Sequence, residues 1–391
     1  MAEHLGGVVR AAVVYDSLFP VTMGGGERLY RRLAELLGER DIRTDYVTRS
    51  FEQDAETDGF SVVGIWRGEI YDVHGTRTTR GAVGFAAAVF RYFITRRGSY
   101  ELVFASALPV LTVLATRFAL LGSGTRVIAD WLEVWPAAKW REYSGPIAGT
   151  IAAVLQRMTA RLVREHTVDS RFTGERLTAV SSHIQPVVLG LFDLIPIGRP
   201  RAAQNPATVV FVGRLIPDKG VLAVPDALAI ARRELPELRA VIIGDGPQRE
   251  ALVTAISVAG LSAVIEVLGR VSDEALEQTR AGAAVLVAPS IREGFGLAVA
   301  EASSWGVPVV VVAHEDNAAV DLVESGVNGF VVVPDDADAL AAGIVEAVRA
   351  GPALRRSSAE WAAAARVTRS LSASLDEILG AASPQGTKRT N

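Results

Sequence analysis

A segment in the second half of the chain combines two glutamates with two glycines at fixed spacing. It reads SIREGFGLAVAEASSWGVP from Ser290 to Pro308, with Glu293 and Glu301 separated by seven residues. Carboxylates accept hydrogen bonds from hydroxyl groups, and the N–H groups at a helix N-terminus favour an anion. The segment therefore predicts a site for a ligand that carries both sugar hydroxyls and an anionic group. The alternative is an acidic helix start stabilised by the helix dipole, with Glu301 merely solvated.

Two cations follow another strand-like run. The segment Phe211–Gly220 reads FVGRLIPDKG, and Arg214 and Lys219 come after the run. Arg binds phosphate with its planar fork and Lys binds it as a point charge, so the pair is suited to neutralising a diphosphate. Solvated surface charges are the alternative for this pair. Two further segments, Gly244–Pro247 (GDGP) and Leu268–Gly269, read as turns after strands.

A run of three glycines follows the first strand-like segment, where Pro20–Arg28 reads PVTMGGGER. Because glycine lacks a Cβ, this loop can bring its backbone close to a ligand. It is not a dinucleotide-binding fingerprint, since Leu29 breaks the G-x-G-x-x-G spacing, and it is not a P-loop, since no Gly-Lys-Ser/Thr follows. A flexible turn between strand and helix is the alternative.

The elements that must position these residues are short apolar runs that alternate with helix-length segments. The runs are rich in β-branched residues, as in strands buried on both faces of a parallel sheet: Ala11–Tyr15, Val209–Gly213, Ala240–Gly244, Ala284–Pro289 and Val309–Ala313. Between them lie the helical segments Glu27–Leu37, Val221–Leu235 and Glu274–Ala281. This alternation predicts a doubly wound α/β fold.

A proline-containing break separates two such α/β halves. Residues 194–207 read LIPIGRPRAAQNPA and predict a linker. We therefore expect one domain over 1–193, a second over 208–368, a helix over 369–382 and a disordered tail over 383–391. The two halves are expected to present the carboxyl ends of their parallel sheets to a central cleft.

The composition narrows the classes of function. The chain of 391 residues has a net charge of −4 and no cysteine. The charge disfavours nucleic-acid binding, and the missing cysteines exclude disulfides, thiolate metal sites and thiol nucleophiles. The longest stretch without a charged residue, Leu177–Phe192, covers 16 residues, whereas a membrane-spanning helix needs about 20 apolar ones. We therefore expect a cytoplasmic protein.

Together these segments resemble the retaining glycosyltransferases of family 4, which have the GT-B fold of two Rossmann-like domains. The resemblance rests on GGGE at 24–27, GRLIPDKG at 213–220, GDGP at 244–247 and EGFGLAVAE at 293–301. The E-x7-E element from Glu293 to Glu301 is the family's most diagnostic motif. The resemblance is strong over residues 208–345, moderate over 11–37, weaker over 128–193 and absent in the tail.

The resemblance implies an enzyme that moves a hexosyl unit from a GDP- or UDP-linked sugar to an acceptor hydroxyl. It implies catalytic positions at Arg214 and Lys219, which would hold the donor diphosphate, and at Glu293, which would bind hydroxyls of the transferred sugar. Glu301 would bind the ribose. The remaining implied donor contacts are Gly25, Gly26, Leu268, Gly269, Gly294, Phe295, Gly296 and Leu297.

The resemblance also assigns roles to the domains. It implies that the domain over 208–368 binds the nucleotide sugar and that the acceptor docks mainly on the first domain. It also implies that the last helix returns to pack against the first domain. The acceptor would be a lipid, a polysaccharide or a small metabolite. No metal and no other cofactor is expected, since the nucleotide sugar is a substrate.

The sequence departs from the family pattern at two places. Relatives often carry a histidine in the loop after a strand in the middle of the first domain, sometimes within W-H-E-V-W. Residues 127–135 of this chain read VIADWLEVW and place Leu132 there. The family's same-face mechanism does not need this side chain, because the leaving diphosphate oxygen takes the acceptor proton. The common Gly-Gly-x-x-Glu of a later loop is replaced by Asn317-Ala318-Ala319-Val320-Asp321.

The remaining candidate ligands favour structural interpretations. The histidines show no metal spacing: His4, His74, His166, His183 and His314. Asp336-Ala337-Asp338 resembles a metal motif of the other main glycosyltransferase fold, but its place before an Ala-rich segment favours helix capping. Four aromatic residues suit either acceptor stacking or core packing: Trp131, Trp135, Trp140 and Tyr143.

A helical stripe formed by Phe85, Val89, Phe90 and Phe93 has arginines on both sides. It is suited to an anionic membrane surface, but a core-facing helix with solvated arginines is favoured. Peripheral membrane contact is therefore not favoured.

Three other functions compete with the transferase. The first is a nucleotide-sugar epimerase or phosphorylase on the same fold. The second is a catalytically weak homologue that acts as a binding or regulatory subunit. A dinucleotide-dependent oxidoreductase is more distant, because the fingerprint fails at Leu29.

Overall fold

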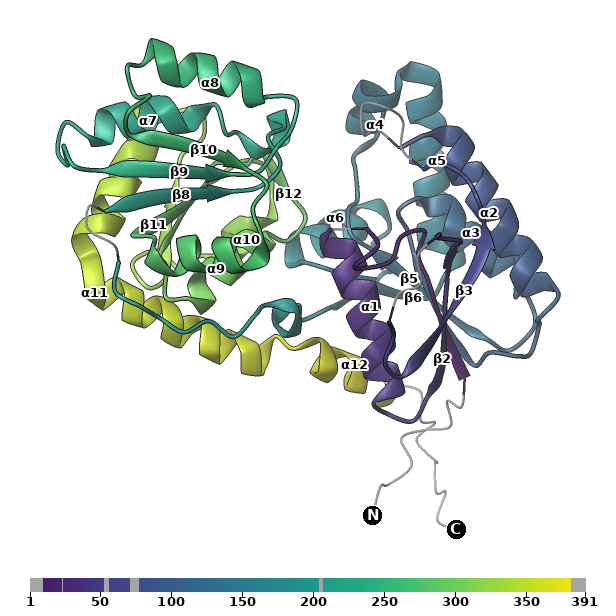
Figure 1. The fold of residues 1–391 in the computed structure, drawn as a ribbon. Coiled ribbons are helices and arrows are strands. Elements are labelled where there is room, and N and C mark those ends of the chain that lie inside the picture. The colour runs from purple at the N-terminus through teal and green to yellow at the C-terminus, as the bar shows by residue number, and fades with distance from the viewer. Residues whose placement is uncertain (1–9, 23, 53–55, 71–76, 204–206, 381–391) are drawn as a thin grey trace. The chain divides into compact units, whose positions relative to one another are not determined.

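The computed structural model describes residues 10–22, 24–52, 56–70, 77–203 and 207–380. The chain divides into two compact units. Unit 1 comprises Met1–Leu194 with Arg369–Asn391, and unit 2 comprises Ile195–Thr368. Each unit is built on a parallel β-sheet covered by helices (Figure 1). The chain is therefore an α/β protein with two Rossmann-like domains, as predicted.

The sheet of unit 1 has the strand order β3-β2-β1-β4-β5-β6-β7, with every pair parallel. Its strands are β1 (Arg10–Val14), β2 (Arg43–Arg49), β3 (Phe60–Trp66), β4 (Leu102–Ser106), β5 (Arg126–Trp131), β6 (Glu165–Val168) and β7 (Val187–Val188). Residues 11–14 of β1 are buried, because helices cover both faces of a central parallel strand. The strand predicted at Ala11–Tyr15 is confirmed, shifted by one residue.

The helices of unit 1 cover the sheet on two faces. They are α1 (Gly25–Gly38), α2 (Thr79–Ile94), α3 (Val110–Ala119), α4 (Ala137–Ser144), α5 (Pro146–Leu162), α6 (Arg171–Val180) and α12 (Leu371–Gly380). The connection through α1 runs from β1 to β2, whereas the one through α3 runs from β4 to β5, in the opposite direction across the sheet. Because such crossovers are right-handed, α1 lies on one face, and α2, α3 and α5 lie on the other (Figure 1).

Helix α12 belongs to unit 1 although it ends the described chain. Leu371 and Leu375 are fully buried, and Arg40, just after α1, donates a hydrogen bond to Asp376 at 2.8 Å. Arg126 at the start of β5 also donates to the carbonyl of Ile378 at 3.1 Å. These contacts attach the C-terminal helix to the sheet of unit 1.

The aromatic stripe of α2 faces mostly inward. Phe85, Val89 and Phe93 are almost fully buried in the core of unit 1, which confirms the core-facing interpretation for them. Phe90 is 41% exposed, so its assignment to the buried stripe is wrong. It is one residue beyond Val89 and therefore about 100° away around the helix.

The main sheet of unit 2 has the strand order β10-β9-β8-β11-β13-β15. Its strands are β8 (Thr208–Val212), β9 (Arg239–Ile243), β10 (Ile265–Gly269), β11 (Val285–Ala288), β13 (Val309–Val312) and β15 (Gly329–Val332), and a separate short pair joins β12 (Arg292–Glu293) to β14 (Asp316–Asn317). The helices are α7 (Ala223–Ala231), α8 (Arg249–Val258), α9 (Asp273–Gly282), α10 (Leu297–Ser304) and α11 (Ala337–Thr368). The predicted helix Val221–Leu235 is shorter than expected. Within the described ranges no helix is long and apolar enough to cross a membrane.

The described part of the expected linker packs onto unit 2. The buried Arg355 of α11 donates to the carbonyl of Arg201 from Nε at 2.9 Å and to the carbonyl of Ala281 at 3.1 Å. Burial lowers the pKa of Arg355, and bonds to backbone carbonyls satisfy the buried guanidinium. Arg355 thus fixes the segment before β8 to the end of α9.

Candidate functional site

The loops after β8 and β11 bring Lys219 and Glu293 together. These strands are parallel neighbours, so their carboxyl ends meet at one edge of the sheet. Lys219 Nζ forms an ion pair with Glu293 Oε1, and Ser290 Oγ donates to the same oxygen at 3.1 Å. The two side chains are 21% and 18% exposed. The site therefore combines a cation and a carboxylate that a ligand at this edge can still reach.

Asp218 joins the same two loops beside this pair. Arg292 donates from its guanidinium to Asp218 Oδ2 at 2.6 Å, and Ile291 N donates to the Asp218 carbonyl at 2.8 Å. Because backbone and side-chain contacts act together, the position of Lys219 relative to Glu293 is fixed by both loops.

Gly220 permits this close approach. It adopts φ +62°, which favours glycine. A Cβ at this position would overlap the carbonyl oxygen of Pro289, the residue that follows β11. The glycine of the Asp-Lys-Gly sequence therefore has a definite steric role.

Gly220→Ala is expected to destabilise unit 2 more than Gly260→Ala. Gly260 is the matched control, since it has φ +70° but no atom within 4 Å of the added Cβ. In the control, the left-handed backbone of the new alanine alone lowers the free energy of unfolding by about 1–2 kcal/mol. In Gly220→Ala, the overlap with Pro289 lowers it by a further ~1–3 kcal/mol. Denaturant unfolding of the two variants measures the difference. Equal losses would show that the contact with Pro289 is not restrictive.

The helix after Glu293 begins as predicted. Gly296 has φ +97° and is the N-cap of α10, so no side chain of the cap residue occupies the first-turn N–H groups. Trp305 follows the helix and Gly306 takes φ +67°, which confirms the predicted helix end. The backbone of Gly294–Leu297 thus lies at a helix N-terminus that favours an anion.

The altered loop at 317–321 supports this helix start. Asn317 Nδ2 donates to the carbonyls of Ser290 at 3.0 Å and Val312 at 2.9 Å, and Asn317 Oδ1 accepts from Ala319 N at 3.1 Å. A Cβ on Gly296 would lie 2.6 Å from Ala319 Cβ. Asn317 therefore holds the loop that carries Glu293, a role that the sequence analysis did not assign.

Glu301 is held in a buried ion pair. Its Oε2 lies 2.8 Å from a guanidinium nitrogen of Arg280 in α9, and the two side chains are 11% and 3% exposed. The alternative of a merely solvated Glu301 is therefore wrong. Sequence reasoning missed Arg280, whose only signal is a charge immediately before the apolar run AGAAVLVAP.

The other candidate donor positions lie on the same sheet edge but are not all in contact. Arg214 follows β8 with an exposed side chain. Leu268, 38% exposed, and Gly269 end β10, which is three strands from β11 in the sheet order. At about 4.8 Å per strand this is roughly 14 Å. A ligand that touches both Leu268 and Glu293 must therefore be elongated.

Gly25 and Gly26 are the first residues of α1 in unit 1, while Met23 of the same motif lies outside the described residues. A Cβ on Gly26 would lie 3.0 Å from both Leu132 Cδ1 and the Tyr15 hydroxyl. Leu132 therefore packs beside the glycine loop. It offers no proton-accepting atom there.

A buried carboxylate beneath this loop was also missed by the sequence analysis. Asp130 of β5 accepts hydrogen bonds from Tyr30 of α1 at 2.5 Å and from Thr167 of β6. Burial raises the pKa of Asp130 to about 6. Burial also raises the pKa of Asp169, with the nearby Asp130 charge adding to the effect. The network fixes α1, and with it the glycine loop, to the central sheet.

Two other structural interpretations are confirmed. His166 is buried and accepts a hydrogen bond from Trp131 Nε1 at 3.1 Å, and burial lowers its pKa. Asp336 accepts from Ala339 N at 2.9 Å and so caps α11. His74 lies outside the described residues.

The sequence of unit 2 matches a known family. Residues 198–366 match Glycosyl transferases group 1. The α-D-kanosaminyltransferase of Streptomyces kanamyceticus is 34% identical over 177 residues, which is 44% of this chain and 44% of that protein. The chain thus spans less than half of the length of this relative.

The fold of the whole chain is similar to solved glycosyltransferase structures. Sucrose-phosphate synthase from Thermosynechococcus elongatus superposes with a TM-score of 0.74 at 18% identity, over 96% of this chain and 100% of that one. HepE from Anabaena, in complex with UDP and glucose, gives a TM-score of 0.66 at 17% identity, over 95% and 98%. The chain therefore has the GT-B fold, and its residues 198–366 match the family model of glycosyl transferases group 1.

Proposed function

We propose that the chain is a retaining glycosyltransferase that moves a hexosyl unit from a GDP- or UDP-linked sugar to an acceptor hydroxyl. The pairing of Lys219 with Glu293 at the carboxyl edge of the unit 2 sheet carries the proposal. The group 1 match covers these residues, and HepE, a protein of the same fold, is known in complex with UDP and glucose.

In this proposal each charged group meets a different part of the donor. Lys219 gives up part of its contact with Glu293 to bind the diphosphate. The exposed Arg214 adds a second cation from the loop after β8. The first-turn N–H groups of α10 face the phosphate, and Glu293 and Glu301 accept hydrogen bonds from sugar and ribose hydroxyls. Leu268 and Gly269 border the base.

The transfer step breaks the bond between the sugar C1 and the diphosphate oxygen and forms a bond from C1 to the acceptor oxygen. The acceptor proton passes to the leaving diphosphate oxygen, on the same face of the sugar. This route requires no base at position 132, where Leu132 has none to offer. Fixed cations that stabilise the developing diphosphate charge supply the main rate enhancement.

The test is product analysis with a panel of GDP- and UDP-sugars, each supplied with lipid, polysaccharide and small-molecule hydroxyl acceptors. We expect nucleoside diphosphate release that depends on an acceptor, with a product that keeps the anomeric configuration of the donor. Conversion of the donor without acceptor identifies an epimerase, and donor consumption with free phosphate identifies a phosphorylase. Tight donor binding without turnover on any acceptor favours a binding or regulatory subunit.

A further inference from the structure

The helices α2, α3 and α5 on one face of unit 1 share an unusual charge pattern. They contain five arginines and no aspartate or glutamate: Arg80, Arg91, Arg117, Arg157 and Arg161. The loop after α2 adds Arg96 and Arg97. Helix α1 on the opposite face contains Glu27 and Glu35 among its arginines. The positive charge of the first face therefore stands out in a chain whose net charge is −4.

The same face exposes large apolar side chains at helical spacing. Along α5 these residues recur every three or four positions and are 37–78% exposed: Ile147, Ile151, Val154, Met158 and Leu162. Residues at such spacing form one stripe on a helix. The neutral surface between these arginines is therefore largely apolar.

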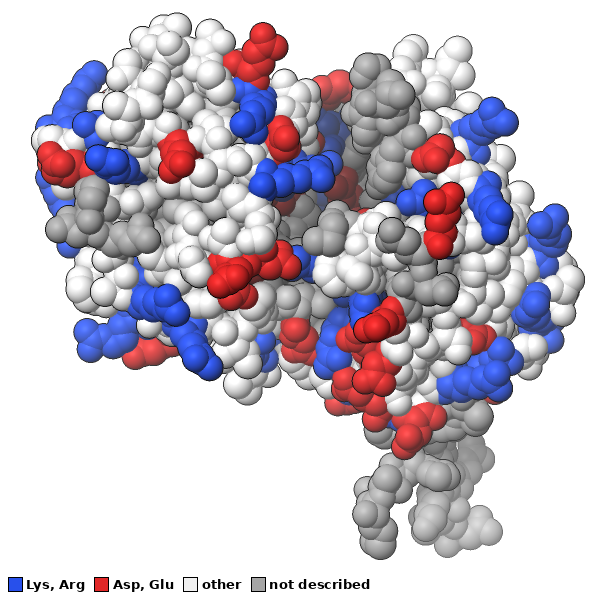
Figure 2. Space-filling view, viewed as in Figure 1, with Lys and Arg blue, Asp and Glu red and all other residues white. Residues whose placement is uncertain are grey.

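The apolar surface continues onto the neighbouring helices. Arg117 of α3 donates to the carbonyl of Leu162 at 3.1 Å, which places the end of α3 beside the end of α5. Phe118 and Leu121 follow with 47% and 53% exposure, and Phe90 of α2 is 41% exposed. Figure 2 shows Lys and Arg side chains in mostly uncharged surface along the edge over α2.

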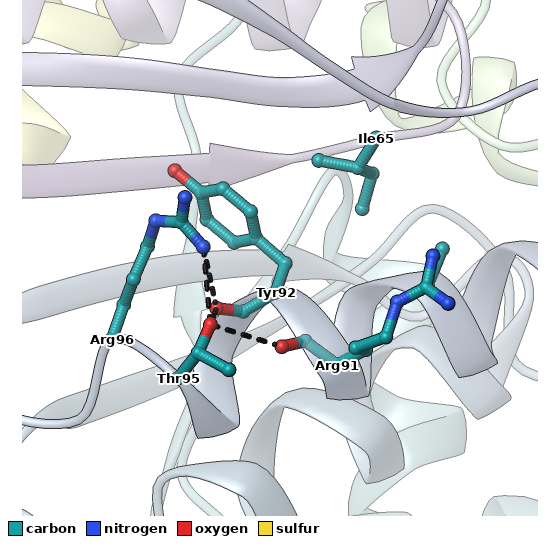
Figure 3. A pocket seen from close by; sticks show the side chains of 6 residues that line it. Ile65, Arg91, Tyr92, Thr95 and Arg96 are labelled. Atoms are coloured by element: carbon teal, nitrogen blue, oxygen red, sulfur yellow. Dashed lines mark hydrogen bonds between the residues drawn. The ribbon is translucent and has the colours of Figure 1, made fainter.

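A shallow pocket of about 270 Å³ lies on the same face, between α2 and β3. Figure 3 shows Arg91 and Arg96 on either side of it, with Tyr92 between them. Arg96 is held over the Tyr92 ring at 4.2 Å from its centroid and donates to the Tyr92 carbonyl at 3.2 Å. The pocket thus offers an oriented guanidinium and a second arginine to a small anion.

We propose that the face formed by α2, α3 and α5 docks onto an anionic lipid bilayer. In this arrangement α5 lies parallel to the membrane with its stripe at the boundary of headgroups and acyl chains, and the arginines contact lipid phosphates. The pocket between Arg91 and Arg96 takes one lipid phosphate. A second copy of the chain is a poorer occupant, because a symmetric pairing of this face would bring arginine-rich surfaces together without carboxylates to balance them.

The experiment is flotation of the full chain with vesicles of phosphatidylcholine alone and with vesicles of roughly equal phosphatidylcholine and phosphatidylglycerol. We expect co-flotation with the second set only, and loss of binding at about 1 M salt, where the screening length falls to about 3 Å. Binding to neither set overturns the proposal. Equal binding to both sets overturns the role of the arginines.

A variant of the α5 stripe and a matched control variant test whether vesicle binding occurs through this face. Ile151→Glu/Val154→Glu/Met158→Glu removes the stripe, and Val253→Glu/Val258→Glu on α8 of unit 2, 50% and 85% exposed, is the matched control. We expect at least tenfold weaker partitioning for the first and no change for the control. Equal weakening of vesicle binding in both variants contradicts membrane docking. So does a stripe variant that floats unchanged but converts a dimer of the chain to a monomer.

A charge variant keeps the test decisive if the stripe variant folds poorly. Arg157→Gln/Arg161→Gln leaves the apolar residues in place and is expected to weaken partitioning roughly tenfold or more. Arg91→Gln is expected to weaken it less, because it removes one contact. Unchanged flotation of both variants would overturn the proposal. Since no donor or acceptor is present, these outcomes are independent of the proposed transferase activity.

Discussion

Lys219→Ala is expected to lower kcat by about 10²–10³-fold, because it removes a fixed cation from the diphosphate that gains charge as it leaves. The structure gives this side chain one ion pair, to Glu293, and a fixed loop position set by Asp218 and Gly220. Turnover of a nucleotide sugar under saturating donor and acceptor measures the effect. Arg214→Ala should lower turnover in the same direction, since it removes the second cation at this edge.

The matched control for this experiment is Lys139→Ala. Lys139 lies in α4 of unit 1 and forms a 3.6 Å ion pair with Glu142, so it is likewise a lysine paired with a glutamate, in a more exposed setting and outside unit 2. We expect its turnover to remain near that of the unchanged protein. If Lys219→Ala keeps full turnover, or if both lysine variants lose it equally, the diphosphate assignment is wrong.

Arg280→Met is expected to destabilise unit 2 by about 3–5 kcal/mol. It removes the guanidinium that lies 2.8 Å from the buried carboxylate of Glu301, and breaking a buried ion pair from one side is costly. The double variant Arg280→Met/Glu301→Met should recover much of the loss, since replacing a whole buried pair by apolar residues is often nearly neutral. Denaturant unfolding of the single and double variants measures the coupling.

A surface pair in the same unit serves as the control. Arg349 and Glu234 also lie 2.7 Å apart, but their side chains are 58% and 54% exposed. Arg349→Met should cost no more than about 1 kcal/mol, because water screens exposed pairs. If Arg280→Met costs no more than this control, Glu301 is not held as the structure indicates.

The sequence was most informative where one segment determines its own structure. The runs before Gly213 and Pro289 are long enough, and rich enough in β-branched residues, to predict buried parallel strands. The glycines that end α10 and start the glycine loop are likewise local signals. Because the strands of unit 2 are parallel, the loops that follow Gly213 and Pro289 lie at the same carboxyl edge of its sheet.

The missed residues depend on partners that are distant in sequence. Arg280 acquires its role only because α9 lies beside α10 and Glu301, and Asp130 only because Tyr30 and Thr167 lie on neighbouring elements. Asn317 reads as an altered motif in the sequence, but it forms bonds to two other loops. Such pairs can be identified only from the three-dimensional structure, because their members lie far apart in the sequence.

The most direct test of the proposed donor site is a crystal structure of the full chain with UDP or GDP bound. For the proposed site we expect diphosphate oxygens within hydrogen-bond distance of Lys219 Nζ and the N-terminus of α10, and ribose hydroxyls near Glu301. A nucleoside diphosphate bound away from the carboxyl edge of the unit 2 sheet, with Lys219 and Glu293 still paired to each other, would contradict it.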